Sequence, residues 1–305
     1  MIFNLITVFV PPNFLKRTRH SLFCSPINVR MKISKKNIAL GLFVFISLAS
    51  CRSLSLKLGK EKQSFQFAGY QWKTKIGEER QGPGNNIFSA QAANLRVDWR
   101  GYLHLNIRPS DSLWYSTEII CQTPMGYGRY EIEIKGTLSD LDPNSVLGFF
   151  TWDPKNFSSQ ANSEIDIEFS KWGYPLSPSL LYYTAHPVSN GKLNLERMYK
   201  SPHPTSQWDG ISTHVIEWRD TSITWSSYTG KEAVLEKRTD YFHYSYRNKK
   251  RLKKLGEEES KAISVPKPGE QTSARINYWL LLDKDQPLSG KCPEIIIRDF
   301  SFEAY

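Results

Sequence analysis

Three carboxylates alternate with isoleucines in the segment Glu164-Ile165-Asp166-Ile167-Glu168. Successive side chains of an extended strand point to opposite faces, so the three acids share one face and the two isoleucines share the other. Packing of the isoleucines against a core does not explain three acids in a row on the opposite face. Carboxylates so close together repel one another, so one pKa rises while another stays low. The segment therefore predicts acid–base chemistry.

Hydrolysis of a glycosidic bond requires such a pair, with one ionised carboxylate as nucleophile and one protonated carboxyl as acid. Four residues of extended chain separate the Cα atoms of Glu164 and Glu168 by about 13 Å. On a concave sheet the two side chains tilt together, which leaves about 5–6 Å between the carboxyls, close to the retaining geometry. Asp166 lies between them and can share a proton with Glu164. The alternative is an exposed strand face that happens to be acidic.

Short segments with alternating apolar and polar residues recur along most of the chain, separated by turn signals such as residues 109–111, 142–144 and 189–191. Their period of two, their β-branched and aromatic residues and the near absence of helical periodicity predict an all-β sandwich. The clearest segments are residues 102–108, 128–135, 163–169, 214–218, 222–225 and 294–302.

The formal net charge of +10 is concentrated in two places. One is the N-terminal stretch, and the other is the basic run 247–254. The remainder is close to balanced and the basic run lacks interleaved aromatic residues, so we expect no nucleic acid as a partner. The run belongs to a charged insertion near residues 245–262. A solvated surface loop is the favoured interpretation, and a patch for an anionic polymer or a lipid headgroup is the alternative.

The N-terminus has the pattern of an export signal. A basic segment begins at Met31, an apolar segment follows, and Leu48-Ala49-Ser50-Cys51 resembles the bacterial lipobox, in which the cysteine is acylated. We interpret residues 1–30 as an over-called upstream extension, 31–50 as a lipoprotein signal peptide and 51–64 as a polar tether. An ordinary cleaved signal and an uncleaved anchor are the alternatives. The expected location is the periplasm or the cell surface, with Cys51 as the lipid anchor in the membrane.

Two cysteines, Cys121 and Cys292, fall within the domain that would be exported. An oxidising compartment permits a disulfide between them. Two buried free thiols are the alternative, because sequence spacing does not place their Cα atoms.

Residues 163–169 resemble the active-site strand of glycoside hydrolase family 16, in particular that of the lichenases (β-1,3-1,4-glucanases). Further segments agree in content and order: residues 125–135, 148–152, 214–218 with 223–225, and 276–279. The resemblance extends over residues 65–305, the predicted catalytic domain. It implies a concanavalin-like jelly-roll sandwich of two antiparallel sheets, whose concave sheet holds an open substrate cleft.

The resemblance also implies roles for individual residues. Glu164 matches the nucleophile, Glu168 the acid/base and Asp166 an assisting carboxylate of a retaining, endo-acting β-glucan hydrolase. The matching substrate contacts are Glu118, Phe150, Trp152, Tyr183, Asn277 and Trp279. Aromatic rings would cover apolar sugar faces, and amide or carboxylate groups would bond sugar hydroxyls. Core packing is the alternative for each, although Phe150 and Trp152, two residues apart, must share a face.

The spacing of the acids bears on the substrate. Laminarinases and agarases of the family usually carry an extra residue, with a bulge, before the last glutamate, whereas this chain has the regular-strand form. A mixed-linkage or similar β-1,4-bonded glucan is therefore favoured over a pure β-1,3-glucan. Catalysis of this type requires no metal or other cofactor. A structural calcium ion occurs in relatives, but the sequence has no acidic ligand loop that demands one.

Two other functions remain open at this point. A transglycosylase would use the same carboxylates and pass the glycosyl group to a sugar in place of water. A non-catalytic surface lectin could be built on the same sandwich. In each case we expect a monomer with a polysaccharide as its partner.

Overall fold

The computed structural model describes residues 63–156, 161–188, 195–246 and 263–305. The predicted signal peptide, the lipid anchor at Cys51, nearly all of the tether and most of the charged insertion lie outside the described residues. No helix in the described ranges has the length and apolar character needed to cross a membrane. The described ranges include five short 3-10 helices: η1 (Leu138–Asp140), η2 (Ala161–Ser163), η3 (Leu195–Arg197), η4 (Thr205–Trp208) and η5 (Leu235–Lys237).

The larger of two sheets contains the acidic segment. Its main strands are, in spatial order, β1 (Ser64–Phe67), β2 (Tyr70–Thr74), β8 (Leu113–Cys121), β17 (Ser273–Leu280), β10 (Ser145–Trp152), β11 (Ile165–Ser170), β12 (Leu181–Ala185) and β13 (Met198–Lys200). Neighbours along this path pair antiparallel. The short strands β3 (Gly77–Gln81), β4 (Asn86–Phe88) and β7 (Arg108–Ser110) extend it beside β8, where β4 pairs in parallel.

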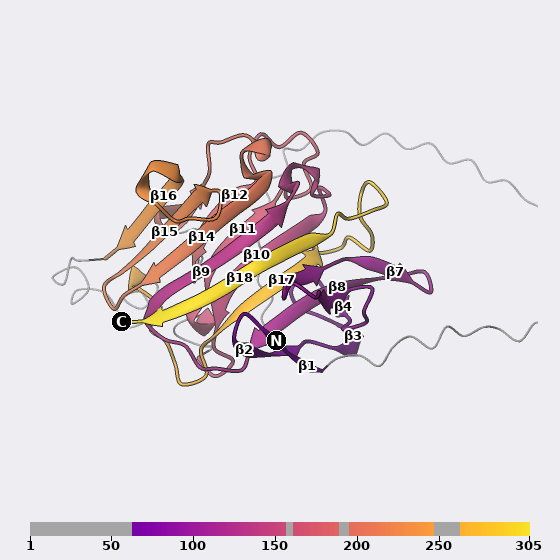
Figure 1. Cartoon of the computed structure of the whole chain (residues 1–305), viewed down its shortest axis with the longest axis horizontal. Coiled ribbons are helices and arrows are strands. Elements are labelled where there is room, and N and C mark those ends of the chain that lie inside the picture. Colours follow the sequence, from indigo (N-terminus) through magenta and orange to yellow (C-terminus); the bar gives the residue numbers. More distant parts are fainter. Residues whose placement is uncertain (1–62, 157–160, 189–194, 247–262) are drawn as a thin grey trace, which may run out of the picture. The chain divides into compact units, whose positions relative to one another are not determined.

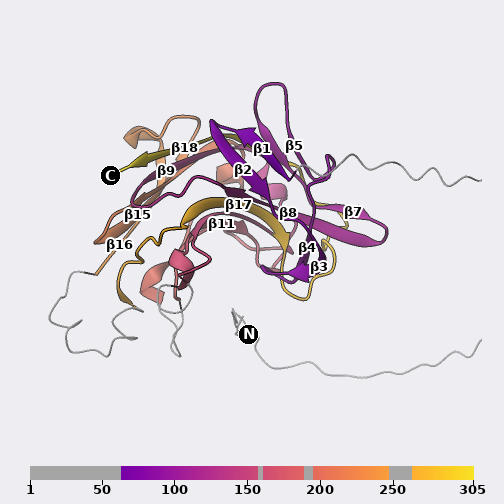
Figure 2. The same ribbon diagram turned by 90° about the horizontal axis from the view of Figure 1, so that it is seen from below.

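The smaller sheet lies over the larger one, as the two views in Figures 1 and 2 show. Its order is β16 (Arg238–Ser245), β15 (Ser222–Thr229), β14 (Gly210–Trp218), β9 (Gly128–Gly136), β18 (Ile295–Ala304), β6 (Leu103–Leu105) and β5 (Leu95–Val97). Figure 2 shows β17 of the larger sheet arched, with its hollow side turned away from the smaller sheet. We call the outer side of the larger sheet the concave face.

The core lies between the sheets and is unusually aromatic. Trp72, Trp208, Trp218 and Trp225 are fully buried, so much of the tryptophan content serves packing. Burial of rings of this size contributes a large share of the hydrophobic stabilisation of a sandwich. Much of the aromatic content of the sequence therefore serves the core.

The structure confirms the predicted all-β jelly-roll sandwich of two sheets. The expected strands 128–135, 214–218 and 222–225 fall within β9, β14 and β15, and segment 294–302 begins one residue before β18. Segment 102–108 divides between β6 and the start of β7. Cys121 and Cys292 are both buried and free, so the free-thiol alternative holds.

Candidate active site

The acidic face predicted from the alternation is present. Ile165 and Ile167 are fully buried between the sheets, which turns Asp166 and Glu168 to the concave face. Glu164 precedes β11 but continues its ladder, because its carbonyl accepts the His186 N–H at 3.0 Å. The pairings of β11 with β10 and β12 run without a register shift. The strand is therefore regular across all three acids, as the five-residue spacing predicts.

The turn before Glu164 is held by a dense set of hydrogen bonds. Ala161, Asn162 and Ser163 have φ values of 44°, 61° and 55°, a region that costs non-glycine residues free energy. The Ser163 carbonyl accepts a bond from Thr151 Oγ1 at 2.7 Å, and the Asn162 amide donates to the Asp153 carbonyl at 2.8 Å. These contacts fix the backbone from which the Glu164 side chain extends.

The smaller sheet also supports the acidic strand. The indole of Trp225 on β15 donates from Nε1 to the carbonyl of Asp166 at 3.0 Å. This hydrogen bond joins the two sheets, since β15 and β11 belong to different sheets. The strand that carries the acids is thus fixed from the core side as well as by its neighbours.

Asp166 is 4% exposed and has a histidine beside it. Nε2 of His186 lies 3.2 Å from Oδ2 of Asp166, although that oxygen receives no hydrogen bond. Glu164 and Glu168 are half-buried on either side. His186 follows β12 and continues the alternation that puts Tyr182 and Thr184 on the concave face, opposite Glu168 and Asp166.

Burial raises the pKa of all three acids. It raises the pKa of Glu164 to about 8 and of Glu168 to about 8, with repulsion from Asp166 adding to both. Burial alone raises the pKa of Asp166 well above its usual range. His186 opposes the shift at Glu164 and Glu168, and Arg275 opposes it at Glu164. Arg275 therefore favours the ionised form of Glu164 only, but repulsion from Glu168 offsets it, and the pKa of both glutamates stays at about 8.

Strands β10 and β17 bring the next predicted residues beside Glu168. Gly148 pairs with Glu168 on one side and with Asn277 on the other. A Cβ on Gly148 would lie 2.4 Å from Oδ1 of Asn277, so the glycine makes room for the amide. Asn277 is 4% exposed and its Oδ1 has no hydrogen-bond partner. Trp279 is 8% exposed and packs with Val146, so little of its ring is accessible.

Phe150 and Trp152 share the concave face, as their spacing predicts. Phe150 pairs with Asp166, and Trp152 pairs with Ser273. Phe150 is mostly buried at 8% exposure, and Trp152 is half-buried. The guanidinium of Arg275 lies over the Trp152 ring, 5.6 Å from its centroid. Trp152 is thus the more accessible of the two rings.

Glu118 lies on the same face, opposite Asn277. Its two carboxylate oxygens face cations, Lys75 at 3.2 Å and Arg275 at 3.1 Å. The side chain is 1% exposed. Glu118 is therefore already bound to two cations, and Lys75 and Arg275 are the groups that a ligand at this position would meet first.

The prediction that Tyr183 contacts substrate is wrong. The register of Tyr183 opposite Ile167 turns it into the core, where it is fully buried. The ring stacks on Trp225 with the centroids 6.0 Å apart, and the hydroxyl donates to Ser227 Oγ at 2.6 Å. The concave-face tyrosine of β12 is its neighbour Tyr182, opposite Glu168.

Three residues of the concave face were not predicted: Tyr182, His186 and Arg275. Each continues a period-two series, since residues 182, 184 and 186 share a face, as do residues 275, 277 and 279. The alternation is the signal that could have found them. A side-chain cluster able to hold a metal ion also occurs in the described part of the chain, formed by Glu164, Asp166 and His186.

Comparison of the sequence with protein-family models and with curated proteins finds no match. Comparison of the structure with solved structures does find similar folds. The Bacillus licheniformis β-glucanase matches with a TM-score of 0.50 at 17% identity, over 80% of this chain and 99% of that chain.

Two further structures agree. SCLam, a non-specific endo-β-1,3(4)-glucanase from family GH16, has a TM-score of 0.54 at 12% identity, over 77% of this chain and 84% of its own. A GH16 protein of the Bacteroides ovatus mixed-linkage glucan locus, in complex with a G4G4G3G product, has a TM-score of 0.52 at 14% identity, over 76% and 94%. At these identities the likeness concerns the fold, and the chain is similar to these proteins as a jelly-roll sandwich of the same architecture.

Proposed function

We propose that the chain is a retaining, endo-acting hydrolase of β-glucan-type polysaccharides. The observation that carries the proposal is the concave acidic face, on which Glu164 and Glu168 flank the buried Asp166 along one regular strand. Three acids held this close together, with Asp166 buried, cannot all ionise freely, so the set holds protons near neutral pH. Glycoside hydrolysis uses this combination of a charged and a protonated carboxyl.

The family resemblance assigns Glu164 as the nucleophile and Glu168 as the acid. Arg275 and His186 stabilise the ionised form of Glu164, whereas among these cations only His186 lowers the pKa of Glu168. Glu168, whose pKa of about 8 leaves it protonated at neutral pH, would donate its proton to the leaving oxygen and later act as base toward water. Asp166 would act as a positioning residue between them, linked to His186 at 3.2 Å.

The concave face supports a neutral, ring-shaped substrate. Trp152 and Tyr182 are half-buried rings on either side of the acidic strand, and Asn277 adds an amide whose Oδ1 has no partner. Such a mixture of flat apolar and hydrogen-bonding groups matches the two kinds of surface on a pyranose. The regular strand and the likeness to β-1,3(4)-glucanases favour a mixed-linkage β-glucan.

The proposal includes a location and partners. The polysaccharide is the partner, no cofactor takes part in the reaction and nucleic acid is not bound. The chain would be exported, act as a monomer and be held at a membrane by lipid on Cys51. A structural calcium ion stays a prediction from the family resemblance.

A panel of β-glucans incubated with the full chain tests the proposal. We expect new reducing ends and a rapid fall in polymer length on one glucan class. Products longer than an oligosaccharide substrate would favour the transglycosylase. Binding without any cleavage would favour a lectin and contradict the hydrolase.

A further inference from the structure

Two carboxylates and an imidazole converge at one end of the acidic face. One possible ligand atom from each of Glu164, Asp166 and His186 lies within 4.8 Å of the other two. Asp166 lies in β11, and Glu164 and His186 directly flank the paired strands β11 and β12, in which Ile165 lies opposite Ala185. The sheet ladder therefore sets their relative positions.

The buried carboxylate in this cluster has an open acceptor. Asp166 is 4% exposed, and its Oδ2 lies among these groups without a hydrogen-bond donor. A buried acceptor without a donor is unfavourable, because it has lost its hydrogen bonds to water and gained none in the fold. Its nearest polar neighbour is an imidazole nitrogen, Nε2 of His186 at 3.2 Å, which can either donate a proton or bind a cation. A cation between the two would satisfy both atoms.

We propose that Glu164, Asp166 and His186 bind a divalent transition-metal ion, with Zn²⁺ as the best match, and that this ion excludes the polysaccharide from the site. Zn²⁺ takes imidazole nitrogen and carboxylate oxygen at about 2.0–2.2 Å, often from three protein ligands and one water. Ca²⁺ and Mg²⁺ prefer oxygen ligands, so the imidazole selects against them.

The geometry fits a tetrahedral ion with one small adjustment. Ligands at these bond lengths lie about 3.3 Å from one another. The 3.2 Å separation of His186 Nε2 and Asp166 Oδ2 matches that edge. The oxygen of Glu164 lies within 4.8 Å, so it has to move by at most about 1.5 Å, which a half-buried glutamate with rotatable side-chain bonds can do.

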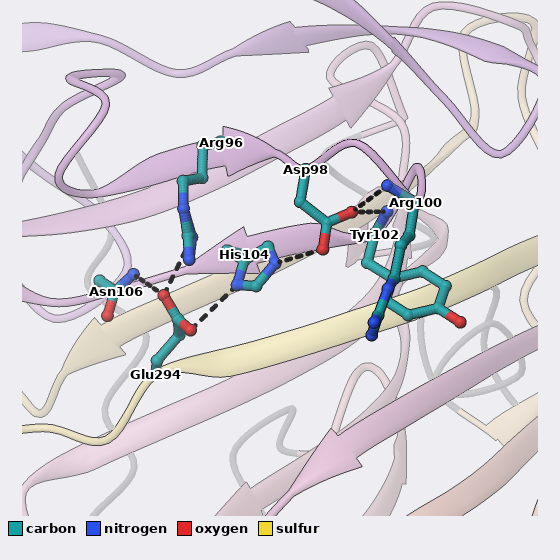
Figure 3. Close-up of polar contacts among 7 residues, drawn as sticks. All are labelled: Arg96, Asp98, Arg100, Tyr102, His104, Asn106 and Glu294. Carbon is teal, nitrogen blue, oxygen red and sulfur yellow. Dashed lines mark hydrogen bonds and ion pairs between the residues drawn. The ribbon is translucent and has the colours of Figure 1, made fainter.

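A second histidine, His104, also lies among carboxylates and serves as a comparison for His186. Its Nε2 lies 3.2 Å from Asp98 and its Nδ1 lies 2.9 Å from Glu294 (Figure 3). Both ring nitrogens face an acid there, and Arg96 and Asn106 also bind Glu294. Nδ1 of His104 makes no hydrogen bond, but neither Asp98 nor Glu294 has a buried oxygen without a hydrogen bond such as Oδ2 of Asp166.

Metal binding and catalysis would compete for Glu164. A carboxylate that ligates Zn²⁺ cannot attack a sugar, so we expect reversible inhibition that a higher glucan concentration relieves. This part rests on the proposed function, whereas binding of the ion does not.

The test is a titration of the EDTA-treated full chain with ZnCl₂ by calorimetry at pH 7.5, followed by absorption spectroscopy with Co²⁺. His186→Gln should lower the affinity at least tenfold. The matched control is His243→Gln, because His243 is exposed and contacts Thr224; its affinity should equal that of the unchanged chain. If His186→Gln does not fold, Asp166→Asn replaces it.

Equal affinity in the unchanged chain and in His186→Gln would overturn the proposal. So would a thiolate charge-transfer band in the Co²⁺ spectrum, which would assign the ion to cysteines. Loss of Zn²⁺ binding in His186→Gln, in a chain that cleaves no glucan, would support the metal site and reject the proposed function. Failure of the metal-site proposal and failure of the proposed function therefore give different results.

Discussion

Replacement of Glu168 by glutamine should make the fold more stable at high pH and leave it unchanged at low pH. Burial and the charge of Asp166 raise the pKa of Glu168 to about 8, against about 4.3 in an unfolded chain. The folded state therefore binds the proton more tightly than the unfolded state does. Stability from this group is fully present below about pH 4 and is lost as the pH rises towards 8. Glutamine has no proton to lose and so lacks this penalty.

The size of the effect follows from the same shift. One pKa unit corresponds to about 1.36 kcal/mol, so an isolated group with this shift would reach about 5 kcal/mol. Glu168 is half-buried and shares its protons with Glu164 and Asp166, which reduces the expected gain to about 2 kcal/mol at pH 8. For a domain of this size that gain raises the Tm by roughly 4–8 °C.

Differential scanning calorimetry at pH 4, 6 and 8 measures the difference, with EDTA in every buffer so that no metal contributes. Glu303→Gln is the matched control, since Glu303 is exposed on β18, and its Tm should follow that of the unchanged chain at each pH. The reasoning would be refuted if Glu168→Gln and the unchanged chain had the same Tm at pH 8. It would also be refuted if Glu168→Gln raised the Tm equally at pH 4 and pH 8.

Three substitutions test other parts of the structure. Asp166→Asn should lower kcat on the order of 10²-fold while the fold is kept, because it removes the carboxylate between the two glutamates; an unchanged kcat would contradict its role. Tyr183→Phe should cost roughly 1–2 kcal/mol in urea unfolding, since it removes the bond to Ser227 in the core, and a changed KM with unchanged stability would contradict its burial. Gly148→Ala should lower kcat/KM on the order of 10²-fold, because a Cβ 2.4 Å from Oδ1 of Asn277 displaces that amide; an unchanged kcat/KM would show that Asn277 does not contact substrate.

The acidic strand could be predicted from sequence because both of its faces are patterned. Ile165 and Ile167 alternate with acids, so a strand assignment fixes which side chains are buried. The same reasoning works for Phe150 and Trp152. The fold class follows from many such segments, whose period of two persists over most of the chain.

The same reasoning fails for the neighbouring strand β12. The residues Leu181, Tyr182 and Tyr183 carry no clear alternation, and a shift of one residue in register exchanges the two faces. The pairing of Glu168 with Tyr182 is set by hydrogen bonds between strands and not by local sequence. Tyr183 was therefore assigned to the wrong face.

Contacts between residues far apart in the chain could not be predicted from the sequence either. Glu118 binds Arg275, which is 157 residues away in the chain, and the sequence gives no sign of that ion pair. The left-handed turn Ala161–Ser163 contains no glycine to mark it. Both features depend on the packed sheet, so they could be found only in the structure.

The most direct test of the central claim is reducing-sugar release from a mixed-linkage β-glucan by the unchanged chain, Glu164→Gln, Glu168→Gln and the control Glu303→Gln. We predict release by the unchanged chain and the control, and a loss of at least about 10²-fold in both active-site variants. Folding of each variant is checked by its thermal transition. Release at the unchanged rate by either active-site variant, or no release by the unchanged chain from any β-glucan, would contradict the account.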